Sequence, residues 1–282
     1  MPQERTRRLG NVVLHLVSDG LCWMDGGGIF GIVPKTMWQR LTEVDEQNRV
    51  QMELNCLLIE TCDEVILVDT GFGPKMPPKQ RDFYRIPESR LLANLAELGY
   101  APEDIHYVVN THLHPDHCGG NTRIEDGTPV PTFPKAVYVI QEQEWHDATH
   151  PNERTKSVYL PENLLPIQKA DQLRLIRGET QITEEVRCLP TPGHTFGHQS
   201  VVVQSEGQTA MYVGDTAHWA LNMERLAWTT AFEVQPLQTV DVKRSIQKWA
   251  LARNALLVFG HDPKTFWGHL FEAEGAVRVT SA

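Results

Sequence analysis

The sequence has few cysteines and no long apolar run. Its five cysteines are odd in number and include no Cys-x-x-Cys pair. A disulfide framework is therefore not expected, and a reducing cytoplasm is the predicted location. The basic start at residues 4–8 is followed only by a short apolar run, Val12 to Val17, with no small-residue cleavage site. Neither a secretory signal nor a membrane partner is expected, because no apolar stretch approaches the ~18 residues that span a bilayer.

Clustered positive charge is also lacking. The chain has 26 Lys and Arg against 36 Asp and Glu, which gives a formal net charge of −10. Nucleic-acid binding needs clustered basic side chains, so no nucleic-acid partner is predicted. The remaining composition, 41% hydrophobic and 22% charged, is that of an ordinary globular protein. No repeat, low-complexity tract or linker divides the sequence, so we predict one domain over residues 1–282.

Apolar runs of strand length are separated by a few amphipathic segments. Strands come first, then a helix, then strands again in each half of the chain, which indicates two sheets packed face to face with helices outside. The predicted strands are 12–17, 54–60, 64–68, 107–109, 136–140, 173–176, 186–189, 200–204, 209–213 and 255–259, and the predicted helices are 89–98, 141–148 and 237–252.

Residues 112–117 read His-Leu-His-Pro-Asp-His and directly follow the apolar stretch 106–110. Neutral imidazole and carboxylate groups are the ligands that hold zinc and other first-row transition metals. At an extended strand end, positions two apart point the same way, so His112 and His114 can bind one ion. The chain then turns at Pro115, which allows Asp116 and His117 to reach a second point nearby. This segment therefore predicts a metal site.

Three further apolar strands each end in a residue of ligand type. His194 follows the strand at 186–189, Asp215 follows 211–214, and His261 follows 256–260. A strand end fixes a side chain better than a mobile loop does, as a metal site requires. We expect these three side chains to converge on the first cluster.

These residues, with Asp69-Thr70-Gly71 upstream, resemble the metallo-β-lactamase superfamily in order and spacing over nearly the whole chain. The resemblance implies an α/β fold, an αββα sandwich of two mixed β-sheets flanked by helices, with two divalent metal ions between the sheets. Zn²⁺ is the expected metal, and Fe, Mn, Co and Ni are compatible with the same ligands. By that resemblance, one ion is held by His112, His114 and His194, the other by Asp116, His117 and His261, and Asp215 bridges both.

Several other polar residues lie close to these positions in the sequence. Asp69 either accepts a hydrogen bond that orients a ligand histidine or is a simple strand-turn residue. His198 is expected to form a hydrogen bond beside the site, because seven ligands already fill it. His218, three residues beyond Asp215, must lie near the bridging carboxylate and is a candidate for contact with substrate.

Two ions that share a water lower its pKa enough to supply hydroxide at neutral pH. The predicted reaction is therefore metal-assisted hydrolysis by attack of a metal-bridging hydroxide. Three residues are predicted to be catalytic. Asp116 or Asp215 would carry the proton towards the leaving group, and His218 would hydrogen-bond the developing oxyanion.

The glycine-rich segment 25–35, followed by Trp38, is similar to the entrance segment of quorum-quenching N-acyl homoserine lactone lactonases of the YtnP type, and residues 193–200 are similar to their second motif. The resemblance implies a small, neutral, apolar lactone or ester as substrate. Ile29, Phe30 and Val33 would then contact an acyl tail, or else belong to a plain turn followed by core residues. An apolar insertion after Asp215 would wall a substrate pocket or form a homodimer surface: Trp219, Met223, Leu226, Trp228 and Phe232.

One departure from the lactonase pattern keeps other substrates in consideration. Many lactonases of the superfamily carry a tyrosine three residues beyond the bridging aspartate, whereas this chain has His218. An Asp-x-x-His sequence at that point also resembles methyl-parathion-hydrolase-like enzymes, so an aryl esterase or phosphotriesterase is the alternative. An iron-dependent persulfide dioxygenase, which uses similar histidines, and a non-catalytic metal-binding protein are further alternatives.

Overall fold

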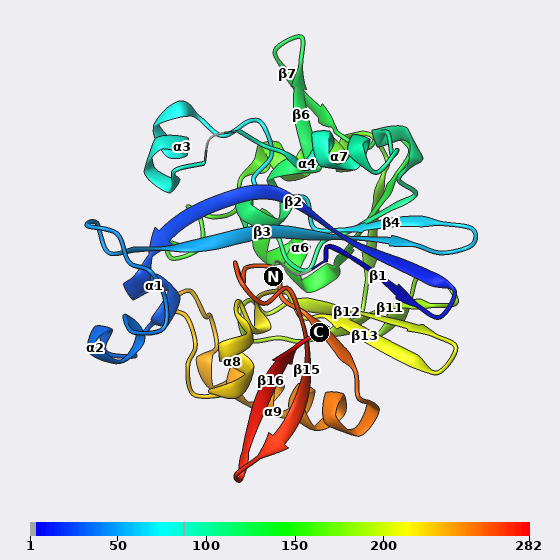
Figure 1. Ribbon diagram of the computed structural model, residues 1–282. Helices are drawn as coiled ribbons and strands as arrows, with labels where there is room; N and C mark the ends of the chain where they lie inside the picture. The colour runs from blue at the N-terminus through cyan, green and yellow to red at the C-terminus, as the bar shows by residue number, and fades with distance from the viewer. Residues whose placement is uncertain (1–3, 87) are drawn as a thin grey trace.

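The computed structural model describes residues 4–86 and 88–282. In this part of the chain, two seven-stranded mixed sheets form the centre of the molecule. Helices α4 and α7 lie on one side of them and α8 and α9 on the other (Figure 1). The predicted αββα sandwich is therefore confirmed. The prediction of one domain over residues 1–282 stays a prediction.

The first sheet has the strand order β1-β2-β3-β4-β5-β8-β9. Its antiparallel part is β1 to β4, and β4, β5, β8 and β9 run parallel to one another. The strands are β1 (Thr6–Leu9), β2 (Val12–Asp25), β3 (Arg49–Glu60), β4 (Val65–Val68), β5 (Tyr107–Val109), β8 (Val137–Gln141) and β9 (Leu173–Ile176). The helices of this half are α1 (Gly26–Phe30), α2 (Lys35–Trp38), α3 (Pro78–Tyr84), α4 (Leu91–Glu97), α5 (Pro115–Cys118), α6 (Glu142–Thr149) and α7 (Pro161–Lys169).

The second sheet follows chain order from β10 to β16, with one parallel pair, β13 and β14. Its strands are β10 (Thr180–Gln181), β11 (Val186–Pro190), β12 (Gln199–Ser205), β13 (Gln208–Tyr212), β14 (Leu256–Val258), β15 (Trp267–Ala273) and β16 (Ala276–Ser281). Helices α8 (Ala220–Glu224) and α9 (Pro236–Arg253) lie between β13 and β14 in sequence. A separate two-stranded sheet pairs β6 (Thr122–Glu125) with β7 (Thr128–Pro131).

The core has three apolar layers because successive residues of a strand point to opposite faces. On β12, Val201 and Val203 lie in the cluster between the sheets, and Val202 lies in the cluster beneath α9. On β3, Leu57 faces the other sheet and Leu58 faces α4. Both sheets are buried on both faces, which is why their central strands read as continuous apolar runs.

The helices cover the outer faces of the sheets with a few apolar side chains each. Leu91 and Leu95 of α4 pack in the same cluster as Leu58. Ile246 and Ala250 of α9 pack in the same cluster as Val202. Burying a large aliphatic side chain of this kind contributes about 1.5–3 kcal/mol. None of the helices in the described residues is both long and apolar enough to cross a membrane.

Several elements differ from the sequence prediction. The strand expected at 12–17 continues to Asp25, because an irregularity between Ser18 and Leu21 lets the pairing with β3 resume after Gly20. The glycine-rich segment begins with a short helix, α1, whose first turn is capped by the Asp25 carboxylate accepting from Gly28 N. Strands β1, β6, β7, β15 and β16 and helix α7 were not predicted, since polar residues and prolines interrupt their apolar pattern.

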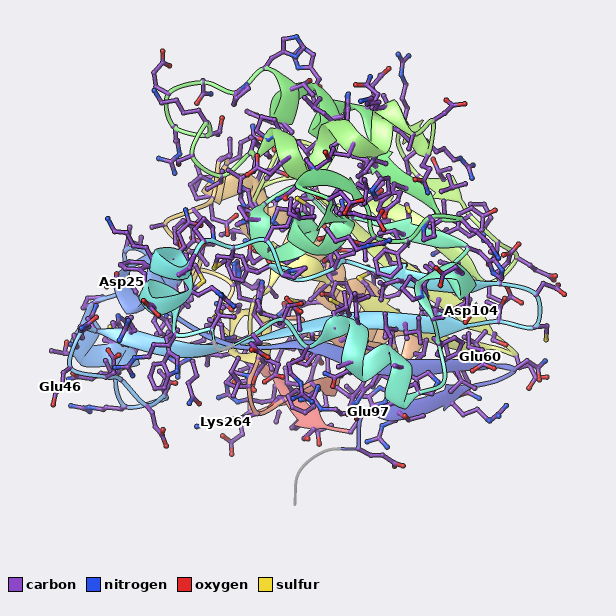
Figure 2. All side chains as sticks on the ribbon, turned by 90° about the horizontal axis from the view of Figure 1, so that it is seen from above. Asp25, Glu46, Glu60, Glu97, Asp104 and Lys264 are labelled. Atoms are coloured by element: carbon purple, nitrogen blue, oxygen red, sulfur yellow. The ribbon has the colours of Figure 1, made fainter. Side chains whose placement is uncertain are left out.

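Exposed acidic side chains account for much of the negative net charge. Glu46, Glu97 and Asp104 lie at the surface on the outer side of the first sheet and its loops (Figure 2).

Candidate metal centre

Parallel strand pairs bring the predicted ligand loops to one edge of the sandwich. Strands β4 and β5 are parallel neighbours and lead into Asp69 and into the loop 110–117. Strands β13 and β14 are parallel neighbours of the second sheet and lead into Asp215 and His261. Because parallel strands finish at the same edge of a sheet, their carboxyl ends are the usual position of a ligand site.

The first cluster contains His112, His114, His194 and Asp215. The Nε2 atom of His194 lies 3.0 Å from His114 Nδ1 and 3.2 Å from Asp215 Oδ2. The His112 Nε2 atom lies 3.8 Å from the same carboxylate oxygen. One atom from each of the four residues lies within 4.8 Å of the others, so these groups could hold a single ion.

The second cluster contains Asp116, His117 and His261 and meets the other oxygen of Asp215. The two Nε2 atoms of His117 and His261 are 2.9 Å apart. Each lies 3.2 Å from Asp215 Oδ1 and 3.6–3.7 Å from Asp116 Oδ2. The structure therefore brings all seven predicted ligands together, with Asp215 between the two clusters.

The polar atoms of the clusters fit a pair of divalent cations. In the described part of the chain, His112 Nε2 and Asp215 Oδ1 are buried without a hydrogen-bond partner. Leaving such groups unpaired is costly. Imidazole nitrogens that face each other at 2.9–3.0 Å need a proton or a cation between them. Imidazole and carboxylate together are the donor set of zinc and its neighbours.

Asp69 orients one of the candidate ligands. Its Oδ2 atom accepts from His117 Nδ1 at 2.8 Å and from Thr111 Oγ1 at 2.8 Å, and its Oδ1 atom accepts from Thr111 N at 2.8 Å. The buried carboxylate holds the His117 proton on Nδ1 and thus leaves Nε2 free to face an ion. Of the two interpretations of Asp69, the orienting one is confirmed.

His198 lies beside the clusters, as predicted. Its Nε2 atom accepts from Asp215 N at 3.0 Å, and its Nδ1 atom donates to Thr191 O at 3.1 Å. Both ring nitrogens are therefore occupied by the protein. His198 fixes the turn that carries Asp215, and an eighth ligand is not needed.

Two buried carboxylates that support the site carry no local sequence signal. Glu144 on α6 accepts from Leu113 N at 2.9 Å, Thr195 Oγ1 at 2.5 Å and Tyr159 OH at 3.1 Å. It thereby joins the loop of His112 and His114 to the loop of His194. Glu233 lies behind the His194 ring. Neither residue was among the predicted site residues.

Close backbone packing fixes the loop that carries Asp116 and His117. A Cβ atom at Gly119 would lie 2.1 Å from Phe72 O, and one at Gly120 would lie 2.2 Å from Thr70 O. Only glycine permits this approach. The segment after Asp69 is therefore held directly against the end of α5.

The ionisable groups of the clusters perturb one another strongly. Burial alone would raise the pKa of Asp215, but the surrounding histidines, His117 first, hold it well below its usual range. Burial alone would lower the pKa of His117, but the carboxylates of Asp215, Asp116 and Asp69 raise it well above its ordinary value. Burial and the neighbouring His194 lower the pKa of His114 to about 3. Such mutual shifts are typical of functional sites.

Comparison with known proteins agrees with this geometry. The family model of the metallo-beta-lactamase superfamily matches residues 52–261, well over half of the chain. The chain belongs to the metallo-β-lactamase superfamily. It is a metal-dependent hydrolase.

Three individual proteins show how far the similarity in sequence and fold extends. An N-acyl homoserine lactonase of Bacillus cereus is 29% identical over 262 residues, which cover 88% of this chain and 92% of the relative. The crystal structure of a probable metal-dependent hydrolase from Staphylococcus aureus is 28% identical, with a TM-score of 0.88 over 98% of this chain and 99% of that one. AidC, a dizinc quorum-quenching lactonase solved with a product, has a TM-score of 0.81 over 98% of this chain and 96% of its own; at 20% identity it shows the fold alone.

His218 lies next to the predicted bridging carboxylate, as its position three residues beyond Asp215 led us to expect. Its Nε2 atom is 3.0 Å from Asp215 Oδ2. Burial lowers its pKa, and the Asp215 carboxylate opposes that shift. The position is confirmed, and a catalytic role for His218 stays a prediction.

The glycine-rich segment contributes core residues. Phe30 stacks on Trp38 with ring centroids 4.6 Å apart and meets the edges of Trp219 and Trp228. Ile29, Phe30 and Val33 are all buried in this aromatic cluster. Of the two interpretations of this segment, the structure favours core residues over direct contact with an acyl tail, and the segment begins with helix α1 where a turn was expected.

The insertion after Asp215 is mostly internal. Trp219, Met223 and Trp228 are buried, Leu226 is half-buried, and Phe232 is 40% exposed. Three of the five side chains are therefore packed inside this chain and cannot form a homodimer surface. A homodimer stays a prediction without an assigned surface.

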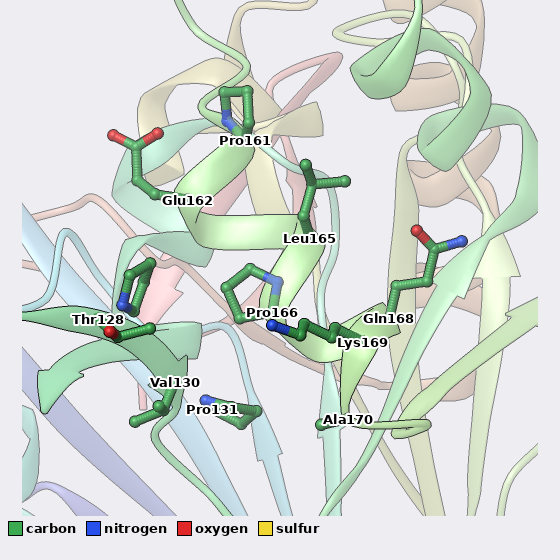
Figure 3. Close-up of a pocket in the computed structure, with 11 residues that line it drawn as sticks. Thr128, Val130, Pro131, Pro161, Glu162, Leu165, Pro166, Gln168, Lys169 and Ala170 are labelled. Carbon is green, nitrogen blue, oxygen red and sulfur yellow. The ribbon is translucent and has the colours of Figure 1, made fainter.

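A cavity of about 860 Å³ lies away from the candidate metal centre, between β7 and α7 (Figure 3). It is lined by residues such as Val130, Pro131, Leu165 and Pro166 and by none of the seven candidate ligands. The candidate metal centre is therefore marked by converging donor atoms and not by this cavity.

Proposed function

We propose that this protein is a dinuclear-metal-dependent lactonase that opens the ring of N-acyl homoserine lactones. The observation that carries the proposal is the donor set bridged by Asp215, in a chain whose similarity to N-acyl homoserine lactonases extends over 88% of its length. A solved N-acyl homoserine lactone hydrolase of similar fold has its product, N-hexanoyl-L-homoserine, bound at the catalytic metal centre.

In this proposal the two clusters are two ion sites, with Zn²⁺ as the expected metal. One ion would be held by His112, His114 and His194, the other by Asp116, His117 and His261, and Asp215 would be a ligand of both. Two such ions supply Lewis acidity and a water that is nucleophilic at neutral pH. The chain's own residues must then bind, orient and exchange protons with the lactone.

Three side chains have chemical roles in the proposal. Burial alone would raise the pKa of Asp215 and of Asp116, but the neighbouring histidines hold both below their usual values. Asp116 is the more exposed carboxylate, with 14% of its side chain accessible. It is therefore the better placed of the two to carry a proton to the leaving alkoxide. His218 offers Nε2–H next to Asp215, where it can donate to the oxygen that gains charge in ring opening.

An aryl esterase or phosphotriesterase is the second candidate function. It is favoured by His218, which occupies the position where many lactonases of the superfamily carry tyrosine. An imidazole N–H can donate to a phosphoryl oxygen as well as to a carbonyl oxygen. The same residues and ions would serve both reactions.

A substrate panel and a metal analysis test the proposal together. The purified protein is assayed for bound metals and then given N-acyl homoserine lactones, simple γ- and δ-lactones, aryl esters and paraoxon-like triesters. We expect two ions per chain and the highest kcat/KM with acylated lactones. Aryl esters or triesters turning over faster than every lactone would favour the second candidate. A single iron with oxygen consumption on glutathione persulfide would replace both with a persulfide dioxygenase.

Two predictions lie outside these assays. Location in the cytoplasm and assembly as a homodimer stay predictions, to be checked by fractionation of the source cells and by light scattering of the purified protein.

A further inference from the structure

A carboxylate from outside the sequence motifs lies directly behind one candidate ligand. Glu233 is 5% exposed, and its Oε1 atom is 3.4 Å from His194 Nδ1. The two loops are joined by their backbones, because Val234 N donates to His194 O at 3.1 Å and Gln235 N donates to Gly193 O at 2.8 Å. The carboxylate and the imidazole are therefore held in a fixed relation.

The Glu233 carboxylate is itself fixed by its neighbours. Thr230 Oγ1 donates to Oε1 at 3.1 Å, and Thr239 Oγ1 donates to Oε2 at 2.6 Å. Lys243 is fully buried, and its Nζ atom donates to Trp228 O at 2.8 Å. Burial lowers the pKa of Lys243 to about 8, and the charge of Glu233 opposes that shift. A buried carboxylate supported in this way remains available as an acceptor for His194.

The partner of Nδ1 decides which face of His194 can bind an ion. A neutral imidazole has one donor and one acceptor nitrogen. A carboxylate at Nδ1 keeps the proton there and leaves the Nε2 lone pair free. That atom is the one that faces His114 and Asp215.

The second cluster contains the same arrangement. Behind His117 lies Asp69, whose carboxylate accepts from Nδ1 at 2.8 Å. The Nδ1 atom of His261 instead faces the backbone oxygen of Glu53. Each cluster thus has one histidine backed by a carboxylate, and in the first cluster that carboxylate is Glu233.

We propose that Glu233 is a positioning residue that sets the affinity of the ion held by His112, His114 and His194. The inference rests on the two-ion site of the proposed function. It assigns to the segment between α8 and α9 a role that its sequence does not indicate. Replacing such a partner lowers metal affinity by about 10–100-fold.

The test measures Zn²⁺ affinity by competition with a chromophoric chelator, on protein first stripped of metal. The variants are Glu233→Leu, which removes the acceptor, Glu233→Gln, which keeps a neutral one, and Glu233→Leu combined with Lys243→Met, which removes both buried charges. Glu142→Leu is the matched control, since Glu142 forms an exposed ion pair with Arg177 on the surface of α6. Thermal melting of each metal-free variant reports on the fold.

We expect the leucine variants to weaken one of the two Zn²⁺ ions by about 10–100-fold, the glutamine variant to weaken the same ion by less, and the control to change neither. Unchanged affinity of both ions in any folded Glu233 variant overturns the inference. Equal weakening of both ions together with a lower melting temperature of the metal-free protein also overturns it, because Glu233 would then act on the fold alone. If both leucine variants fail to fold, the glutamine variant decides by the same criteria.

The proposed function can fail separately. Wild-type protein that binds two Zn²⁺ ions and hydrolyses no lactone would refute the lactonase proposal, while the affinity comparison would still decide the role of Glu233. Wild-type protein that binds fewer than two ions would refute both.

Discussion

Replacing Asp69 with asparagine tests whether the supporting carboxylate controls the second ion site. The side chain is 1% exposed and accepts three hydrogen bonds of 2.8 Å, two from Thr111 and one from His117 Nδ1. Asparagine has nearly the same shape and tolerates the backbone φ of 60° at this position. The change therefore removes the charge and one acceptor without adding strain.

The expected cost follows from these contacts. Asparagine keeps one oxygen for Thr111 N, but its amide group is a donor where His117 needs an acceptor. Hydrogen bonds to a charged group are worth about 1.5–3 kcal/mol, and an unpaired buried donor costs about 1–3 kcal/mol. We expect the metal-free protein to lose about 2–4 kcal/mol of unfolding free energy. If the amide instead donates to Nδ1, the His117 proton moves to Nε2, and the ion loses that ligand.

Urea unfolding of the metal-free protein and zinc analysis of the loaded protein measure the two effects. We expect Asp69→Asn to retain about one tightly bound ion in place of two, with the affinity of the second reduced about 10–100-fold. Asp63→Asn, in the exposed turn between β3 and β4, is the matched control. Two ions bound with wild-type affinity in the Asp69 variant would refute the reasoning.

Four further substitutions have defined outcomes. Asp215→Ala should abolish turnover and lose metal in an elemental assay, and a variant that keeps both ions would show that the bridging role is wrong. His218→Ala should keep both ions and lower kcat by about 100-fold; an unchanged rate would remove His218 from the catalytic residues. Gly119→Ala should destabilise the fold by about 3 kcal/mol in urea, because its Cβ would lie 2.1 Å from Phe72 O, and wild-type stability would contradict that packing. Leu57→Ala should cost about 2–5 kcal/mol, since this side chain is fully buried between the sheets; a smaller loss would mean that the core repacks.

The sequence predicted the candidate site well because its signals are local. His112, His114, Asp116 and His117 are adjacent in the chain, and His194 directly follows an apolar strand and a tight turn. Strand ends next to ligand-type residues are visible without any knowledge of tertiary contacts. The seven residues consequently lie together in the structure, while their binding of metal stays a prediction.

The supporting groups could not be predicted in the same way. Glu144 looks like any charged residue of a surface helix, and Glu233 lies in a segment that reads as an apolar insertion. Each becomes important only when the chain places it against Thr195 or His194. Strands β15 and β16 were missed for a related reason: polar residues interrupt their alternation, and long-range pairing defines them.

Each of the two donor clusters takes side chains from both halves of the sandwich. In the first cluster, His112 and His114 come from the half with the first sheet and His194 from the half with the second. In the second cluster, His117 of the first half lies next to His261 of the second. In the proposed two-ion site, neither half alone would supply a full set of ligands, so binding of an ion with full affinity would require the docked sheets. Loading then stabilises the docked state by mass action. On that proposal, activity would be gained only after the two halves have closed on each other.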